Sequence, residues 1–315
     1  MFSSIKMKSS PLASIDRFFS GIGLGGGTDL KIDNSQKVDQ EETLPTKTTV
    51  SPPVNAPVIG IIGAKGGVGA TIFAINLACA FGKKDKQSIL IDCNLQQPDV
   101  ALTLGLSPKY NLCDLIERRS RLDEKVLAAC CERIEFEKQV LEVITPPLDL
   151  ESSLAADLSV LPECLERIQP LKEVIFLDLP KQLDQNLLSL LDCCDRIILV
   201  TEPTISSVSG AKRWLSVFSD LDYSRDDIAI AFNRSGKNLK QMEQEAAKAL
   251  GLKRTWYLPS SYNALEQSCL EGTPLVVSHS KDAYVKSVVK IAEDLEAWLA
   301  PGAGTGIKAE DKADV

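Results

Sequence analysis

Short apolar runs alternate with amphipathic stretches from residue 57 to residue 299. The apolar runs are rich in β-branched residues and uninterrupted by charge, as is typical of strands buried on both faces of a parallel sheet. Strands are expected at 58–62, 88–92, 139–144, 173–178, 196–201, 227–232 and 255–258. Apolar residues at helical spacing predict helices over 70–82, 111–118, 122–132, 159–168, 184–193, 205–219, 238–250, 262–271 and 282–299. This alternation predicts an α/β fold with a doubly wound, mostly parallel sheet.

Polar residues stand where several of these strands end. Asp92 and Asp178 are the last residues of two predicted strands, Asn233 follows a third, and a glycine-rich stretch follows the first. Ligands of doubly wound folds bind at the carboxyl ends of the strands. We therefore expect these residues to converge on one binding site.

The glycine-rich stretch Gly63–Thr71 reads Gly-Ala-Lys-Gly-Gly-Val-Gly-Ala-Thr and has the composition of a phosphate-binding loop. Glycines let backbone N–H groups turn toward phosphate oxygens, a following helix directs its positive dipole end at the anion, and a Thr hydroxyl can bind Mg²⁺. The predicted nucleotide-binding positions are Gly66, Gly67, Val68, Gly69, Ala70 and Thr71. The alternative is a glycine-rich turn that binds no ligand.

The lysine that normally precedes this Thr and reaches the β- and γ-phosphates is replaced by Ala70, whereas Lys65 lies five residues earlier. The segment Lys65-Gly-Gly-Val-Gly-Ala-Thr71 resembles the deviant Walker A motif of the MinD/ParA ATPases. Ala in the second lysine position resembles the CpaE/TadZ branch, which acts in the assembly of Flp (tight-adherence) type IVb pili. Further segments match the family in order at 88–102, 173–180, 196–203, 229–234, 258–262 and 272–275. The resemblance covers roughly residues 56–299.

The resemblance assigns roles to individual residues. Lys65 would reach across a homodimer to the nucleotide of the second subunit, and Lys65 and Asp92 would be the catalytic side chains. Mg²⁺ would be held by Thr71, Asp92 and Asp178. Asn233 would read the adenine of ATP, with Pro259 and Tyr262 close to the base. The alternative for Asn233 is an Asn that caps a turn after a strand.

Two departures from the family affect hydrolysis. Asn94 stands where hydrolysing members have a second acid that helps to position the attacking water, and Ala70 removes an ammonium. An amide carries no charge and cannot accept a proton, so both changes remove groups that assist phosphoryl transfer. We expect ATP binding with weak or absent hydrolysis. The alternative is that Lys65 folds back within its own chain and sustains ordinary ATPase activity.

Composition narrows the class of protein. The chain has 315 residues and a net charge of −8, which argues against non-specific binding to nucleic acid. Nine cysteines, an odd number without zinc-like spacing, indicate a reducing compartment and hence a cytoplasmic protein. The sequence shows no signal peptide and no apolar run as long as a membrane span. A single histidine, His279, argues against histidine-based catalysis.

The two ends of the chain differ from the centre. Residues 1–56 predict a flexible N-terminal tail with a short amphipathic helix near 11–20, followed by a polar, proline-containing linker. This helix is a candidate docking peptide or peripheral membrane contact, at the inner membrane or the cell pole. Alternatively, it packs on the domain or stays disordered. Residues 57–299 form the predicted nucleotide-binding domain, and residues 300–315 a disordered C-terminal tail.

Three functions follow from this sequence. The first is an ATP-dependent, dimerising localisation or scaffold factor for Flp-type pilus assembly, with pilus or secretion components as partners. The second is an active MinD/ParA-type ATPase that cycles on membrane or nucleoid to position a division site, a plasmid or flagella. The third is a degenerate scaffold that binds no nucleotide.

Overall fold

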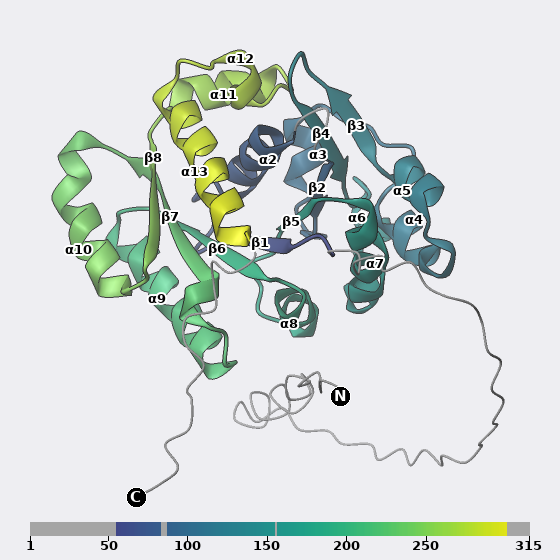
Figure 1. Cartoon of the computed structure of the whole chain (residues 1–315), viewed down its shortest axis with the longest axis horizontal. Helices are drawn as coiled ribbons and strands as arrows, with labels where there is room; N and C mark the ends of the chain where they lie inside the picture. The colour runs from purple at the N-terminus through teal and green to yellow at the C-terminus, as the bar shows by residue number, and fades with distance from the viewer. Residues whose placement is uncertain (1–54, 83–86, 155, 301–315) are drawn as a thin grey trace, which may run out of the picture. The chain divides into compact units, whose positions relative to one another are not determined.

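An eight-stranded sheet lies at the centre of the part of the chain that the computed structural model describes, residues 55–82, 87–154 and 156–300 (Figure 1). The strand order is β3-β4-β2-β5-β1-β6-β7-β8. The strands are β1 (Val58–Gly63), β2 (Ser88–Asp92), β3 (Glu132–Glu135), β4 (Val140–Ile144), β5 (Val174–Asp178), β6 (Arg196–Thr201), β7 (Ile228–Ser235) and β8 (Arg254–Pro259). Every neighbouring pair is parallel except β3 and β4. The predicted doubly wound, mostly parallel fold is confirmed.

The predicted strands are all present, and two details differ. β7 continues to Ser235 through an irregularity in its pairing with β8, so that Asn233 lies within the strand and not after it. β3, which pairs antiparallel with β4 at the edge of the sheet, was not predicted. The predictions for residues 1–54 and 301–315, including the helix near 11–20, concern residues outside the described ranges.

Helices connect successive strands, except β3 and β4. They are α2 (Ala70–Phe81), α3 (Asp99–Thr103), α4 (Leu112–Glu117), α5 (Glu124–Cys130), α6 (Leu150–Leu154), α7 (Leu161–Ile168), α8 (Gln185–Asp192), α9 (Ile205–Asp220), α10 (Lys240–Leu250), α11 (Tyr262–Leu270), α12 (Leu275–Ser278) and α13 (Ala283–Leu299). Each predicted helix overlaps one of them. The unpredicted helices α3, α6 and α12 have only five, five and four residues.

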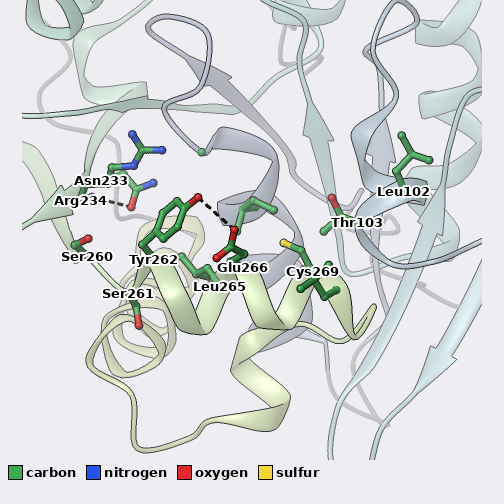
Figure 2. Close-up of a pocket in the computed structure, with 13 residues that line it drawn as sticks. Leu102, Thr103, Asn233, Arg234, Ser260, Ser261, Tyr262, Leu265, Glu266 and Cys269 are labelled. Carbon is green, nitrogen blue, oxygen red and sulfur yellow. Dashed lines mark hydrogen bonds between the residues drawn. The ribbon is translucent and has the colours of Figure 1, made fainter.

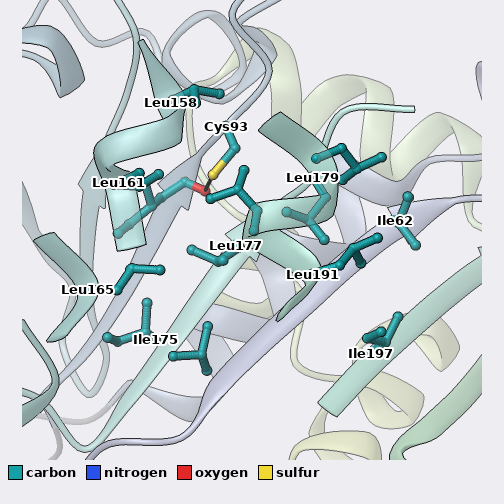
Figure 3. Packing of buried hydrophobic residues seen from close by; sticks show 14 of the residues in the cluster. Ile62, Cys93, Leu158, Leu161, Leu165, Ile175, Leu177, Leu179, Leu191 and Ile197 are labelled. Atoms are coloured by element: carbon teal, nitrogen blue, oxygen red, sulfur yellow. Dashed lines mark hydrogen bonds between the residues drawn. The ribbon is translucent and has the colours of Figure 1, made fainter. Parts of the chain in front are cut away.

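Two apolar layers enclose the sheet because consecutive strand residues point to opposite faces. On one face, Ile59 and Ile61 of β1 pack in a layer with α2, α12 and α13. On the other face, Ile62 packs in a layer with α4, α7, α8, α9 and α10. Figure 3 shows part of this second layer, where Ile175 and Leu177 of β5 lie among Leu161, Leu165 and Leu191. The strands are therefore fixed on both faces, and the loops at their carboxyl ends stand on a rigid support.

Polar side chains cap the first turn of several helices. Asn111, Asp123, Asp184, Thr204 and Asp282 each accept a hydrogen bond from a backbone N–H of the helix that follows. Such caps satisfy donors that the helix itself leaves unpaired. α2 is different, because its cap is Gly69 and no side chain accepts from its first turn. The N-terminus of α2 therefore keeps N–H donors that can face an anion.

Candidate functional site

The loop between β1 and α2 forms an open cradle. Gly67 and Gly69 have φ angles of +75° and +83°, in the left-handed region that favours glycine. A Cβ atom built on Gly69 would lie 2.5 Å from Asn233 Nδ2, whereas one built on Gly66 or Gly67 would meet nothing within 4 Å. Packing therefore closes the back of the loop, and open space lies in front of it. An exposed glycine loop at an uncapped helix N-terminus fits a phosphate group.

Two carboxylates and one hydroxyl stand beside this cradle. Asp92 and Asp178 are direct register partners at the ends of the neighbouring strands β2 and β5. Thr71 Oγ1 donates to Asp178 Oδ2 over 2.8 Å. Asp92 accepts from the backbone N–H groups of Asn94, at 2.9 Å, and Val100, at 3.2 Å. The structure thus brings together the three side chains predicted to hold a metal ion.

Burial changes the acidity of both carboxyl groups. Loss of hydration raises the pKa of Asp178 to about 7, although the hydrogen bond from Thr71 and the charge of Lys181 act in the opposite direction. Burial, followed by repulsion from Asp178, raises the pKa of Asp92 well above its usual range. Two buried acids with too few positive neighbours favour a bound cation, which would stabilise their ionised form.

The donor set fits Mg²⁺, which prefers oxygen ligands and keeps several of its own waters. Within the described residues, no group of three or more His, Cys, Asp or Glu side chains is placed to hold a metal ion by itself. Thr71, Asp92 and Asp178 would therefore share a magnesium ion with phosphate oxygens and water. This combination is usual for a metal that arrives with a nucleotide.

A cavity of about 510 Å³ opens beside the loop, between α11 and α3 (Figure 2). Tyr262, Leu265 and Glu266 come from α11, whereas Leu102 and Thr103 come from α3. The other lining residues are Gly69, Ile72, Asn233, Arg234, Ser260, Ser261, Cys269 and Leu270. The lining is mainly apolar with a few polar groups, which is the usual character of a site for a small organic ligand.

Asn233 joins the cavity to the phosphate loop. Its Nδ2 donates to the carbonyl oxygen of Val68 over 2.8 Å, and its Oδ1 accepts from the backbone N–H of Arg234 over 2.9 Å. One amide N–H and one lone pair remain for a ligand. The predicted contact with adenine stays a prediction. Pro259 ends β8 beside Ser235 and does not line the cavity, whereas Ser260 and Ser261 directly after it do.

Lys65 contacts the segment that follows β6. Its ammonium is 3.4 Å from Ser206 Oγ and 3.5 Å from Glu202 Oε2, and its side chain is 39% exposed. Ser206 lies in the first turn of α9, and Glu202 directly follows β6. In a single chain, Lys65 therefore rests on the segment after β6.

Sequence reasoning did not select Glu202 or Arg234 as site residues. Arg234 lines the cavity, donates to Glu202 Oε1 over 2.6 Å and donates to the carbonyl oxygen of Gly67 over 3.1 Å. Their positions in the sequence could have indicated a role in the site, because Arg234 directly follows Asn233 and Glu202 directly follows β6.

The segments after β2 and β5 also meet. Gln96 Nε2 donates to Gln182 Oε1 over 3.0 Å, and a second cavity of about 330 Å³ lies between these segments. Asn94 and Lys181 both line it. Asn94, which replaces the second acid of the family, therefore faces open space beside Asp92.

Within the described residues, no helix combines the length and the apolar character needed to cross a membrane.

Comparisons with known proteins identify the family and the fold. The family profile described as "AAA domain" (AAA_31) matches residues 56–230. An uncharacterized ATP-binding protein of Methanocaldococcus jannaschii is 26% identical over 242 residues, which cover 76% of this chain and 88% of the relative.

Two solved structures share the fold. A ParA family ATPase from Chlorobium tepidum superposes with a TM-score of 0.70 at 23% identity, covering 75% of this chain and 98% of the other. The septum site-determining protein MinD of Pyrococcus horikoshii, complexed with Mg-ADP, gives a TM-score of 0.63 at 21% identity, with 76% and 96% covered. The chain therefore belongs to the AAA_31 family of AAA domains, and its fold is that of the MinD/ParA-type P-loop ATPases.

Proposed function

We propose that this protein binds ATP with Mg²⁺, forms a nucleotide-dependent homodimer through Lys65, and acts as a localisation or scaffold factor with little or no ATP hydrolysis. The observation that carries the proposal is the open cradle at the N-terminus of α2, with the Thr71–Asp178 pair and Asp92 beside it. The Mg-ADP complex of the Pyrococcus MinD, which has the same fold, supports the choice of ligand.

The chain's own residues divide the work. Backbone N–H groups of Gly66–Ala70 would bind phosphate oxygens, and Thr71, Asp92 and Asp178 would hold Mg²⁺ with its waters. Bound Mg²⁺ would neutralise phosphate charge, as it does in other phosphate-binding sites. Asn233 and the cavity beside α11 would accept the base. These assignments place the nucleotide across the carboxyl ends of the strands, in agreement with the general rule for such sheets.

A dimer is supported by apolar side chains exposed at this same edge of the sheet. Leu102, Tyr262 and Leu270 around the cavity are 65%, 63% and 79% exposed, and Ile205 beside Ser206 is 88% exposed. Exposed apolar residues grouped around a binding site commonly mark a surface that another molecule covers. A second copy placed over the nucleotide would cover them and would bring its Lys65 close to the phosphates.

Weak hydrolysis is supported by what the site lacks. Ala70 provides no ammonium, and Asn94 provides no carboxylate next to Asp92. Both groups would otherwise stabilise or position charge during phosphoryl transfer. In the single chain, Lys65 contacts Glu202 and Ser206, which also argues against its replacing the missing lysine from within the same chain.

The process that we propose for this scaffold factor is the assembly of Flp-type (type IVb) pili. It is supported by Ala70, through the resemblance of the loop to the CpaE/TadZ branch. Pilus or secretion components would be the partners, and the protein would act in the cytoplasm, at the inner membrane or at a cell pole. The second candidate is an active positioning ATPase of the kind named by the Chlorobium and Pyrococcus structures, since Thr71, Asp92 and Asp178 are all retained.

One experiment separates these functions. The molecular mass in solution would be measured with and without Mg-ATP for wild type and Lys65→Ala, and phosphate release would be read from the same samples. We expect a dimer that needs ATP, is lost in Lys65→Ala and releases negligible phosphate. Rapid release would establish the active ATPase instead. A mass that ignores ATP would overturn the proposed switch.

A further inference from the structure

Glu202 is a buried carboxylate that neutralises two cations at the edge of the phosphate loop. Its side chain is 7% exposed, and its two oxygens face Arg234 and Lys65 respectively. A carboxylate at this depth is stable only when it is paired and hydrogen-bonded. The two partners differ in how firmly they are held, and this difference is the basis of the inference.

The backbone around Glu202 is fixed. Its N–H donates to Ser207 Oγ over 3.0 Å, and its carbonyl oxygen accepts from the N–H of Thr204 over 2.8 Å. Ser207 is fully buried and also hydrogen-bonds Thr201 at the end of β6. The carboxylate is therefore presented at a set position, and its partners must come to it.

Arg234 is the firmly held partner. It approaches Glu202 Oε1 to 2.6 Å, and its other terminal nitrogen donates to the carbonyl oxygen of Gly67 over 3.1 Å. The Arg234 side chain is 51% exposed, so the two partners differ in the lengths of their contacts and not in their exposure. Arg234 can therefore neutralise Glu202 by itself.

Lys65 is the loosely held partner. Its ammonium is 3.5 Å from Glu202 Oε2 and 3.4 Å from the hydroxyl of Ser206, and its side chain is 39% exposed. This pair is longer than the 2.6 Å contact of Arg234 with the same carboxylate, so separating it costs less. When Lys65 leaves, Glu202 remains paired with Arg234, and no buried charge is left uncompensated.

We propose that Glu202 is a positioning residue that retains Lys65 within its own chain until the phosphates of a second, nucleotide-loaded copy compete for it. This inference rests on the proposed function, because it concerns the same Lys65 contact across the dimer. The competition favours transfer only when the second site is loaded, since a triphosphate carries more negative charge than one carboxylate. Glu202 thereby disfavours pairing of copies that lack nucleotide.

The test is Glu202→Gln, which removes the charge and retains an amide oxygen that can accept from Arg234. Glu163→Gln is the matched control, because Glu163 on α7 also pairs with an arginine, Arg119 at 3.2 Å, and contacts neither Lys65 nor the cavity. The dimer dissociation constant at saturating Mg-ATP would be measured by sedimentation equilibrium for both variants and wild type. Glu202→Gln is expected to tighten the dimer about fivefold, the scale of one partly exposed ion pair, and Glu163→Gln to leave it unchanged.

The outcomes are distinct. A tighter dimer in Glu202→Gln alone, with an unchanged melting temperature, supports retention of Lys65. If wild type dimerises and Glu202→Gln has the same or a larger dimer dissociation constant, this inference is overturned and the proposed function stands. If neither protein dimerises with Mg-ATP, the proposed function fails and this inference fails with it. If Glu202→Gln unfolds, Ser206→Ala is the second variant, because it removes the other Lys65 contact. It is expected to tighten the dimer by a smaller factor. An unchanged dimer dissociation constant in Ser206→Ala would overturn the inference.

Discussion

Two glycines of the phosphate loop differ in their surroundings although the sequence presents them alike. Gly69 has a φ of +83° and is packed against the Asn233 amide, whereas Gly66 faces open space. Gly69→Ala is therefore expected to lower the free energy of unfolding by about 1–3 kcal/mol, because it forces a left-handed alanine into a closed contact. Urea unfolding without nucleotide measures this directly.

Gly66→Ala is expected to weaken ATP binding and to leave the stability of the protein nearly unchanged. Its methyl group meets nothing within 4 Å in the protein, so the free energy of unfolding should change by less than about 0.5 kcal/mol. The same methyl group points into the space that phosphate would fill, and ATP binding should weaken by about 1–3 kcal/mol, the usual cost of an extra methyl in a filled site. Titration with a fluorescent ATP analogue measures it. Unweakened binding would show that phosphate does not occupy the cradle.

The acidity of Asp178 predicts how stability depends on pH in the absence of metal. Its pKa is about 7 in the folded protein and about 3.9 in an unfolded chain. Between these values the folded state keeps the proton and the unfolded state releases it, so stability falls as pH rises from about 4 to about 7. In EDTA, wild type should lose roughly 2–3 kcal/mol more than Asp178→Asn between pH 5 and pH 8. Equal losses in urea unfolding of the two proteins would refute this assignment.

At the scale of elements, one side chain ties the phosphate-loop helix to the C-terminal part of the domain. Asn76 of α2 accepts from the N–H of Val276 in α12 over 3.0 Å and donates to the carbonyl oxygen of Ile72 over 2.9 Å, and it is 2% exposed. Asn76→Ala leaves a buried N–H unpaired and should cost about 1–3 kcal/mol. Gln241→Ala, which removes an exposed amide on α10, is the control and should change stability by less than about 0.5 kcal/mol. Equal effects in thermal unfolding would contradict the coupling of α2 to α12.

The strands and helices that could be predicted from the sequence are those with a long run or a regular spacing of apolar residues. β1, β2 and β5 are buried along their whole length, so each reads as one apolar run. β3 reads Glu-Arg-Ile-Glu and depends on β4 for its pairing, and a four-residue strand with that composition carries little signal of its own. α3 and α12 are too short to show a 3.6-residue period.

Some residues of the candidate site could be predicted from the sequence, and others could not. Asp92 and Asp178 could be predicted because an acid that ends an apolar strand is placed by the sheet rule alone. The Glu202–Arg234 pair could not, because it joins residues 32 positions apart and requires β6 and β7 to be neighbours. It also requires a left-handed backbone at Arg234, which nothing in the residue type indicates. Contacts of this kind follow from topology and become visible only when the strand order is known.

At the scale of the whole molecule, the binding site joins strands that lie far apart in the sequence. The phosphate loop follows β1, Asp92 ends β2, Asp178 ends β5 and Asn233 lies in β7. A ligand that contacts all four segments binds only the folded sheet, and its binding free energy therefore adds to the free energy of unfolding of the entire domain. The effect of ligand on the melting temperature thus reports whether the four segments form one site.

We expect Mg-ATP at about 100 times its dissociation constant to add about 2.7 kcal/mol and, for a domain of this size, to raise the melting temperature by roughly 5–10 °C. Removal of Mg²⁺ with EDTA should cancel most of this rise, because Asp92 and Asp178 would then face the phosphates without a cation between them. Thr71→Val keeps the shape of the side chain and loses the hydroxyl, so its rise should be smaller and should depend less on Mg²⁺. Absence of any rise in wild type would leave a scaffold that binds no nucleotide, and a rise that persists in EDTA would show that Thr71, Asp92 and Asp178 do not hold the metal.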